Sequence, residues 1–252
     1  MVEENILSFR VYGRKALYTD PITRVGGEKL SYPVPTFEAV KGIAESILWK
    51  PTIRLVPLRI RVMNPIRMRS EGIRPIAYNG GNTLSQYTYL ADVDYQVEFR
   101  FVWNEARPDL MHDRNENKYF FMFKRMIEKG GRRDVFLGTR ECQAYIEPCI
   151  FGEGQGYYDK KSESEDDSVI DFGVMLHGVD YPDEVGGDEL RVRLWNCAMK
   201  NGIIEFVSPE ECTMVRTIRK AEKKTFMLGT NLEPIEDTVK EVECDELEQS
   251  LV

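Results

Sequence analysis

Apolar residues in the first half of the chain recur with two different spacings. Leu7, Phe9 and Val11 alternate with polar residues, which is the two-residue period of a half-buried strand. The same alternation over residues 87–103 is the clearest strand signal in the sequence. A third strand-like run, residues 53–63, has arginines interleaved among its aliphatic side chains. These three segments predict strands of one sheet.

Two other segments carry the spacing of amphipathic helices. Thr36 is placed to cap a helix that ends before Pro51 and has the inner stripe Val40, Ile43, Ala44 and Ile47. The second helix is expected over residues 114–129, with Asp113 and Glu116 as a variant of the capping box. Its apolar face would comprise Tyr119, Phe120, Phe123, Met126 and Ile127.

With residues 64–86 as a long hairpin or loop and a last strand over residues 134–145, the predicted order is β-α-β-β-α-β. That order predicts an α+β, ferredoxin-like domain, the arrangement of RNA-recognition (RRM) domains. The aromatic motif with which such domains stack bases on the sheet is absent from the sequence. The fold is therefore predicted without that mode of base recognition.

The rest of the chain has a different character. Residues 172–179, 191–199 and 203–207 predict a small antiparallel β-sheet domain, with Asn201 and Gly202 forming a hairpin turn. We therefore predict a ferredoxin-like domain over residues 1–150 and a small β domain over residues 151–224. Residues 225–252 are acidic and lack apolar periodicity, and are expected to form a disordered tail.

Charge is distributed unevenly along the 252 residues. The net charge of −8 combines a basic part, residues 1–150 with 23 Lys+Arg and 18 Asp+Glu, with an acidic part, residues 151–252 with 11 and 24. The basic part is the one to inspect for nucleic-acid binding. Five cysteines without a CxxC pair and only two histidines argue against a zinc site, and no metal or other cofactor is expected. Without a membrane-spanning run or a basic leader, we expect a cytoplasmic protein without membrane contact.

Cations gather where the second predicted helix ends. Gly130 and Gly131 follow the helix, and the surrounding cations are Lys118, Arg125, Lys129, Arg132, Arg133 and Arg140. Cations near a helix C-terminus are stabilised by the helix dipole, so ordinary capping explains part of this pattern. Cations beside glycines, where a ligand's backbone can approach closely, also suit a polyanion. Both interpretations are open on this segment alone.

Several motifs occur in order over roughly residues 5–220: Gly26-Gly-Glu-Lys-Leu-Ser-Tyr, Val34-Pro-Thr, Lys41-Gly-Ile-Ala-Glu-Ser-Ile-x-Trp-Lys-Pro-Thr, Gly81-Asn-Thr-Leu, Arg107-Pro-Asp-Leu, Gly130-Gly-Arg-Arg-Asp-x-Phe-Leu-Gly-x-Arg-Glu-Cys, His177-Gly-x-x-Tyr-Pro-Asp-Glu, Val192-Arg-Leu-Trp and Met199-x-Asn-Gly. Together they resemble the Dvulg-subtype (type I-C) Cas-five family. The resemblance implies a RAMP-type ferredoxin-like domain and a small C-terminal β domain. The implied activity is metal-independent cleavage of CRISPR precursor RNA beside each repeat hairpin, by attack of a ribose 2′-hydroxyl that leaves a 2′,3′-cyclic phosphate.

The family's catalytic residues are a tyrosine on the first helix and a lysine–histidine pair on the second. Lys118 matches the lysine, whereas Tyr119 stands at the histidine position and Leu48 at the tyrosine position. Leucine cannot exchange protons, and a phenol with a pKa of about 10 is a poor base at neutral pH. His112 is a candidate replacement for the imidazole, although a surface histidine is the simpler interpretation. His177 matches the family, and we interpret it as structural.

From these residues and this resemblance we predict a type I-C Cascade subunit that binds the CRISPR repeat RNA and cleaves its precursor. Lys118 is the predicted phosphorane-stabilising residue and Tyr119 a weak acid–base group. Phosphates would be bound by Arg125, Lys129, Arg132, Arg133 and Arg140. The implied partners are the crRNA and the backbone and large subunits of Cascade, with target DNA reached only through the assembled complex.

Two other functions are compatible with parts of the sequence. In the first, the chain is a non-catalytic subunit that binds the crRNA 5′ handle and assembles Cascade, as the substitutions at Leu48 and Tyr119 would allow. In the second, it is an unrelated acidic α+β interaction domain, which explains the composition but not the ordered motifs.

Overall fold

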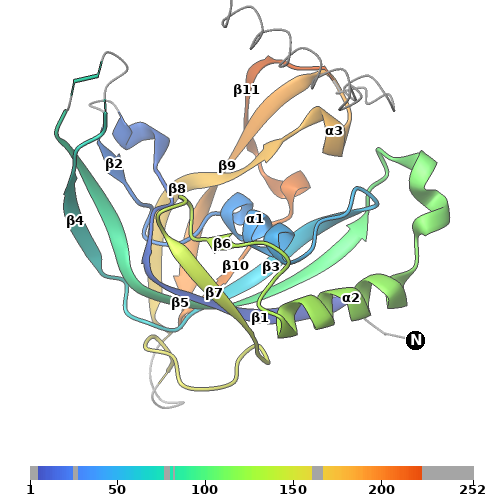
Figure 1. Cartoon of the computed structure of the whole chain (residues 1–252), viewed down its shortest axis with the longest axis horizontal. Coiled ribbons are helices and arrows are strands. Elements are labelled where there is room, and N and C mark those ends of the chain that lie inside the picture. Colours follow the sequence, from blue (N-terminus) through green and yellow to red (C-terminus); the bar gives the residue numbers. More distant parts are fainter. Residues whose placement is uncertain (1–4, 25–27, 77–79, 82, 161–166, 223–252) are drawn as a thin grey trace, which may run out of the picture.

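The protein forms a mixed α+β structure in which one antiparallel sheet dominates (Figure 1). This computed structural model describes residues 5–24, 28–76, 80–81, 83–160 and 167–222. The predicted tail over residues 225–252 lies outside them. The described strands join in the order β11-β9-β10-β3-β5-β1-β7-β6, with β2 and β4 also pairing with β5 and β8 with β9.

The first 150 residues supply four principal strands: β1 (Ile6–Ala16), β3 (Ile53–Val62), β5 (Ser85–Trp103) and β7 (Gln143–Pro148). They lie in the order β3-β5-β1-β7, and each neighbouring pair is antiparallel. Two helices pack against this sheet and touch each other, α1 (Phe37–Ile47) on β3 and α2 (Glu116–Glu128) on β1 and β7. The predicted α+β class with an antiparallel sheet is therefore confirmed.

The core forms where the predicted apolar positions of strands and helices meet. Phe9 and Val11 of β1 and Phe99 and Phe101 of β5 are buried together with the inner stripe of α1 and with Tyr119, Phe123 and Ile127 of α2. Phe120 and Met126, also predicted for that face of α2, are partly buried. The ring of Phe123 on α2 lies 5.3 Å from that of Phe99, which anchors the helix on the sheet. Each such buried aromatic side chain contributes roughly 1.5–3 kcal/mol through burial. The period-2 and period-3.6 patterns thus identify the faces that meet in the core.

Two predicted boundaries differ from the structure. The strand expected over residues 134–145 is divided into β6 (Val135–Phe136) and β7, because Gly138 between them has a φ of 91° and turns the chain. The second helix is capped by Asn115, whose side chain accepts a hydrogen bond from the backbone of Lys118 over 2.9 Å. Asp113, the predicted cap, instead ends the 3₁₀ helix η2 (Pro108–Asp113).

The C-terminal strands extend the sheet of the first part. They are β8 (Val169–Asp180), β9 (Glu189–Lys200), β10 (Ile203–Glu205) and β11 (Met214–Lys220), the last of which the sequence pattern did not predict. We expected these strands to form a sheet of their own, but β10 pairs with β3 and makes the sheet continuous. The predicted turn at Asn201 and Gly202 is confirmed, because both residues have positive φ and connect β9 to β10. The division into domains at residue 150 stays a prediction.

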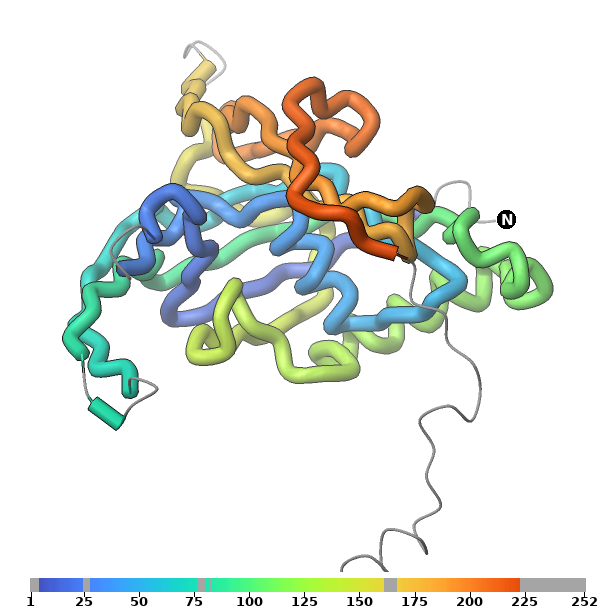
Figure 2. Tube along the Cα trace, turned by 90° about the horizontal axis from the view of Figure 1, so that it is seen from above, coloured from blue at the N-terminus to red at the C-terminus, as the bar shows by residue number. Residues whose placement is uncertain are grey.

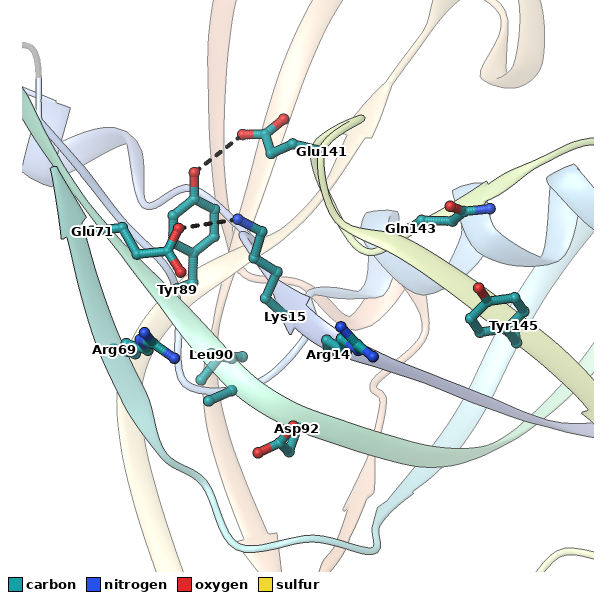
Figure 3. A pocket seen from close by; sticks show the side chains of 11 residues that line it. Arg14, Lys15, Arg69, Glu71, Tyr89, Leu90, Asp92, Glu141, Gln143 and Tyr145 are labelled. Carbon is teal, nitrogen blue, oxygen red and sulfur yellow. Dashed lines mark hydrogen bonds and ion pairs between the residues drawn. The ribbon is translucent and has the colours of Figure 1, made fainter. Parts of the chain in front are cut away.

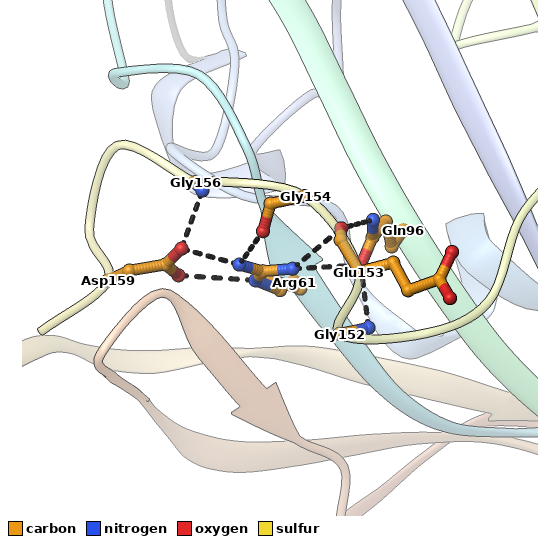
Figure 4. Close-up of polar contacts among 7 residues, drawn as sticks. All are labelled: Arg61, Gln96, Gly152, Glu153, Gly154, Gly156 and Asp159. Carbon is orange, nitrogen blue, oxygen red and sulfur yellow. Dashed lines mark hydrogen bonds and ion pairs between the residues drawn. The ribbon is translucent and has the colours of Figure 1, made fainter.

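A buried arginine attaches the segment after β7 to the sheet (Figure 4). Arg61 on β3 is 5% exposed and binds the carboxylate of Asp159 through two nitrogens, at 3.2 and 2.5 Å. Its remaining donors reach the carbonyl oxygens of Glu153 and Gly154 and the side chain of Gln96. A buried guanidinium is stable only when its charge and its donors have partners, and here they do.

The remaining described elements are short or peripheral: η1 (Pro21–Arg24), β2 (Lys29–Leu30), β4 (Met68–Ile73), α3 (Pro182–Val185) and η3 (Pro209–Glu211). Figure 2 shows that β4 projects from the body of the molecule at the end opposite η2. No helix among the described residues is long and apolar enough to cross a membrane.

Candidate functional site

A polar cluster lies at the N-terminal end of α2 and contains both predicted catalytic residues. The carboxylate of Asp113 binds the ammonium of Lys118 with one oxygen and accepts from the hydroxyl of Tyr119 with the other. The hydroxyl of Thr52, just before β3, donates to that second oxygen over 2.9 Å. Because η2 ends at Asp113 and α2 starts after Asn115, the chain folds back and directs the carboxylate at the first turn of α2.

The three donors determine the charge states in this cluster. The hydrogen bond from Lys118, followed by those from Tyr119 and Thr52, holds the pKa of Asp113 well below its usual range. The same contact raises the pKa of Lys118, so its ammonium stays charged at neutral pH. Burial and then the contact with Asp113 raise the pKa of the Tyr119 phenol. The cluster therefore contains a fixed cation, a carboxylate that is a weak base and a protonated phenol.

Tyr119 and Leu48 are both core residues. Tyr119 is 0% exposed, and its ring lies 5.9 Å from the ring of Trp103. Leu48 is 2% exposed at the C-terminal end of α1. Of the predicted catalytic pair, only Lys118 reaches solvent, with 45% of its side chain exposed. The structure thus offers Lys118 to a ligand and uses Tyr119 to hold Asp113.

Neither histidine belongs to the cluster. His112 is exposed on η2, where its Nδ1 lies 3.2 Å from the carbonyl oxygen of Asp109. His177 is buried in β8, where Nε2 contacts the carbonyl oxygen of Val207 over 2.9 Å and the ring stacks on Phe37. Burial lowers the pKa of His177 to about 4. Its interpretation as a structural residue agrees with this environment.

The predicted cationic segment after α2 is a rigid elbow, defined here as residues 129–133. The N–H groups of Gly130 and Gly131 donate to the carbonyl oxygens of Ile127 and Met126, which is a Schellman cap with Gly130 at a φ of 79°. The N–H groups of Arg132 and Arg133 then donate to the last carbonyls of α1. The elbow backbone therefore caps two helices at once.

The predicted phosphate-binding side chains remain exposed. Among the described residues, none of the five forms an ion pair: Arg125, Lys129, Arg132, Arg133 and Arg140. Their charges are therefore available to an anionic ligand. Lys118 and the elbow lie at opposite ends of α2, which at 1.5 Å per residue places Lys118 roughly 16 Å from Lys129. The sequence-predicted residues thus form two groups along one helix.

Two open pockets flank β7 beside the elbow. One, of about 690 Å³, is lined by Lys129, Arg132 and Arg133, and it shares Gln143 and Tyr145 with a second pocket of about 630 Å³. Figure 3 shows this second pocket, in which Lys15 binds Glu71 over 3.1 Å while Arg14 lies between that pair and β7. A ligand that lies along the elbow can therefore continue across β7. No group of three metal-ligating side chains occurs among the described residues.

Comparison with known proteins identifies the family. The sequence profile of Cas5d, described as CRISPR-associated protein (Cas_Cas5), matches residues 6–207. The chain belongs to the Cas5d family. A relative from Thermus thermophilus, named CRISPR pre-crRNA endoribonuclease Cas5d, is 31% identical over 195 residues, which are 73% of this chain and 77% of the relative. A relative of the same name from Mannheimia succiniciproducens is 29% identical over 225 residues, or 80% and 94% of the two chains.

Solved structures agree with this assignment. One titled as a CRISPR-associated protein has a TM-score of 0.69 and 34% identity, covering 85% of this chain and 97% of that one. A functionally uncharacterized protein from Streptococcus mutans has a TM-score of 0.70 and 35% identity, with coverage of 85% and 98%. The Cas5d fold therefore extends over most of this chain.

Sequence reasoning missed two members of the cluster, Asp113 and Thr52. The Asp-x-x-Glu spacing predicts Asp113 as a helix cap, which hides its contact with Lys118. Thr52 lies in a motif that supported the family resemblance, but nothing in its spacing connects it to α2. One signal in the sequence is that Asp113 precedes Lys118 by five positions, because a carboxylate at that distance can pair with the lysine once the chain folds back.

Proposed function

We propose that this Cas5d protein binds the repeat RNA of CRISPR precursor transcripts and cleaves it beside the repeat hairpin. The observation that carries the proposal is the row of exposed cations along α2 and the elbow, which have no ion pair among the described residues and lie on the same helix as the partly exposed ammonium of Lys118. Cations without intramolecular partners can neutralise phosphates and release counterions. The names of the relatives in T. thermophilus and M. succiniciproducens support the choice of RNA and of cleavage.

In the proposed reaction a ribose 2′-oxygen bonds to the adjacent phosphorus as the bond from phosphorus to the 5′-oxygen breaks, which leaves a 2′,3′-cyclic phosphate on one product. Water takes up the proton of the 2′-hydroxyl and supplies a proton to the departing 5′-oxygen. Lys118 stabilises the negative charge of the phosphorane because it stays protonated at neutral pH. Asp113 fixes the direction of the ammonium, and the Tyr119 hydroxyl holds Asp113, so Tyr119 acts here as a positioning residue. Its predicted role as a weak acid–base group stays a prediction.

A second candidate function is binding of the crRNA 5′ handle without cleavage. The burial of Tyr119 and Leu48 favours it, because neither side chain reaches an RNA ribose in this conformation. Each acid–base group is typically worth about 10²- to 10⁴-fold in rate, so a site without them would retain mainly the electrostatic contribution of Lys118.

A cleavage assay on the cognate repeat RNA separates the two functions. We expect single-turnover cleavage that persists in EDTA, yields 2′,3′-cyclic phosphate ends and stops when the ribose at the cut is 2′-deoxy. Tight binding of intact RNA would support handle binding, whereas a requirement for added Mg²⁺ would contradict the proposed mechanism. Absence of RNA binding would reject both functions.

The domain type, the partners and the location of the protein belong to the same proposal. The strand order β3-β5-β1-β7 with two helices on one face supports a ferredoxin-like, RAMP-type domain over residues 1–150. The partners would be the crRNA and the backbone and large subunits of Cascade, and target DNA would be reached through the assembled complex. The proposed location is the cytoplasm.

A further inference from the structure

A pocket of about 600 Å³ lies where the start of β3 and the end of β5 meet α3, β9 and η3. It is separate from the pockets beside the elbow. Two arginines of the sheet line it, Arg54 on β3 and Arg100 on β5. Arg54 pairs with Val102 across the strands and Arg100 pairs with Val56, so the two arginines are diagonal neighbours on one face. Long side chains at diagonal positions can reach the same ligand.

Neither arginine has an ion-pair or hydrogen-bond partner among the described residues. Arg100 is exposed, whereas the Nε of Arg54 is buried and its N–H has no acceptor. An unsatisfied donor on a charged group is costly to bury, and a bound anion at this position would supply the acceptor. The pocket thus lacks an acceptor at Arg54.

The acidic side chains of the pocket do not fill that role. Asp180 binds Arg193 and lies 3.4 Å from Arg191, while Glu184 binds Lys41 at 2.5 Å. Glu105 is engaged by Arg114 outside the pocket, at 3.0 Å. Among the described residues, Glu210 is the one lining acid of the four without an ion pair or side-chain hydrogen bond, and its charge acts on Arg193 and His177. Five cationic side chains line the pocket against these four acids, so the lining has a net positive charge.

Its shape and position suit a nucleotide. Apolar side chains of Val56, Val102 and Pro209 line the space next to the arginines. Trp103 lines the same pocket and contacts the Tyr119 ring of the Lys118 cluster. Arg54 is two residues from Thr52 of that cluster, about 7 Å along an extended strand. A strand bound at Lys118 would reach this pocket within a few nucleotides.

We propose that Arg54 and Arg100 bind a phosphate of the RNA segment that flanks the cleavage position, with the adjoining sugar or base against the apolar wall. This inference rests on the proposed function. Guanidinium groups suit the task because their fork geometry matches phosphate oxygens. The bound phosphate would also supply the missing acceptor for the Nε of Arg54. The elbow and this pocket would then hold the RNA on the two sides of Lys118.

The first test measures the affinity of the full-length protein for repeat RNA, made uncleavable by a 2′-deoxy residue at the mapped cut. The double variant Arg54→Gln/Arg100→Gln is expected to bind at least about 10-fold more weakly, because charge-assisted phosphate contacts are lost. The control Arg24→Gln/Arg74→Gln removes two exposed arginines outside this pocket and has the same net charge. A general loss of charge would weaken both double variants equally, and that result would overturn the proposal.

The second test locates the contact by replacing single phosphates with neutral methylphosphonates. In the parent protein, replacing one or two phosphates near the cut should weaken RNA binding. The same replacements should hardly change the affinity of Arg54→Gln/Arg100→Gln, because the contact is already lost there, as a double-mutant cycle requires. Arg100→Gln alone should show part of this coupling, and its exposed position keeps the fold intact. If every linkage behaves alike in parent and variant, the pocket does not bind the RNA backbone. Failure of the parent to bind RNA would instead reject the proposed function itself.

Discussion

The backbone N–H of Arg132 donates to the carbonyl oxygen of Ile47 over 3.1 Å, and this contact connects the elbow after α2 to the last turn of α1. The four last carbonyls of a helix need partners outside the helix, and here the next residue, Arg133, serves a second one, that of Ser46. Only backbone atoms are used. Both arginine side chains therefore stay free for a ligand while their Cα positions are fixed.

The first prediction follows from this division of roles. Arg132→Ala with Arg133→Ala should weaken repeat-RNA binding and reduce the slope of log K against log salt by about 1.4 to 1.8, as the loss of two phosphate contacts implies. Thermal stability should change little, because alanine keeps the backbone donors that cap α1. Fluorescence anisotropy at several salt concentrations and a thermal melt measure both effects.

A matched control is available on β11, where Arg216 and Arg219 are exposed. Replacing these two by alanine changes the net charge equally but should leave the slope close to that of the parent. An unchanged slope in the elbow variant would remove Arg132 and Arg133 from the RNA site.

Much of the fold follows from local pattern. The strands β1 and β5 and the helices α1 and α2 have strict apolar periods, and Thr36 caps α1 as predicted, accepting from the backbone of Ala39 over 3.1 Å. The single sheet could not be predicted, because the pairing of β10 with β3 joins residues about 140 positions apart with no local signal. Likewise β11 alternates too weakly to be recognised, since most of its side chains are exposed.

The residues of the candidate site that lie on one element could be predicted, whereas those brought together by the fold could not. Lys118 and the elbow cations are visible in the sequence because they lie on or beside one helix. The role of Asp113 depends on η2, which turns the chain so that its carboxylate contacts Lys118, Tyr119 and Thr52. The helix cap is Asn115, two positions after the predicted cap Asp113, and apolar periodicity cannot locate a helix end to within two residues.

The second prediction concerns the division of roles between Lys118 and Tyr119. Lys118→Ala should lower single-turnover cleavage by about 10²-fold or more, because the phosphorane loses its fixed cation, while RNA affinity falls only slightly. Tyr119→Phe removes only the hydroxyl that holds Asp113 and should lower the cleavage rate less. Its pH–rate profile should keep the shape of the parent's profile. If Tyr119→Phe abolishes cleavage and Lys118→Ala does not, the phenol is the catalytic group.

The third prediction concerns Arg61, whose guanidinium holds the segment around residues 153–159. Arg61→Met should destabilise the protein by about 3–5 kcal/mol, because Asp159 and two carbonyl oxygens lose their partner in a buried environment. Urea denaturation measures the change. The control Arg59→Met removes a more exposed arginine of the same strand, paired with Glu98, and should cost about 1 kcal/mol or less. Equal losses in both variants would show that the buried network adds nothing.

The last prediction is a pH dependence of stability that arises from His177. The Nε of Arg193 faces Nδ1 of this ring at 3.5 Å, and Nε2 contacts the carbonyl oxygen of Val207, so the neutral imidazole satisfies both neighbours. A proton on Nδ1 would be directed against the guanidinium, and burial already lowers the pKa to about 4. The negative charge of Glu210 acts in the opposite direction and raises the pKa of His177, but Glu210 is exposed.

The sign follows from proton binding. The unfolded chain takes up a proton on this histidine near pH 6.5, whereas the folded chain does so only near pH 4, so unfolding is favoured as the pH falls between these values. The contribution is fully present above pH 6.5, and up to about 3 kcal/mol is lost by pH 4.

His177→Gln does not titrate and, with an amide, still offers a donor for Val207 and an acceptor for Arg193. The difference in unfolding free energy between pH 7 and pH 4.5 should therefore be smaller in this variant than in the parent. Other titrating groups, such as Glu45, whose pKa burial raises to about 7, are common to both proteins and cancel in the comparison. Identical pH dependence in the two proteins would show that His177 accepts a proton in the folded state as readily as in the unfolded chain.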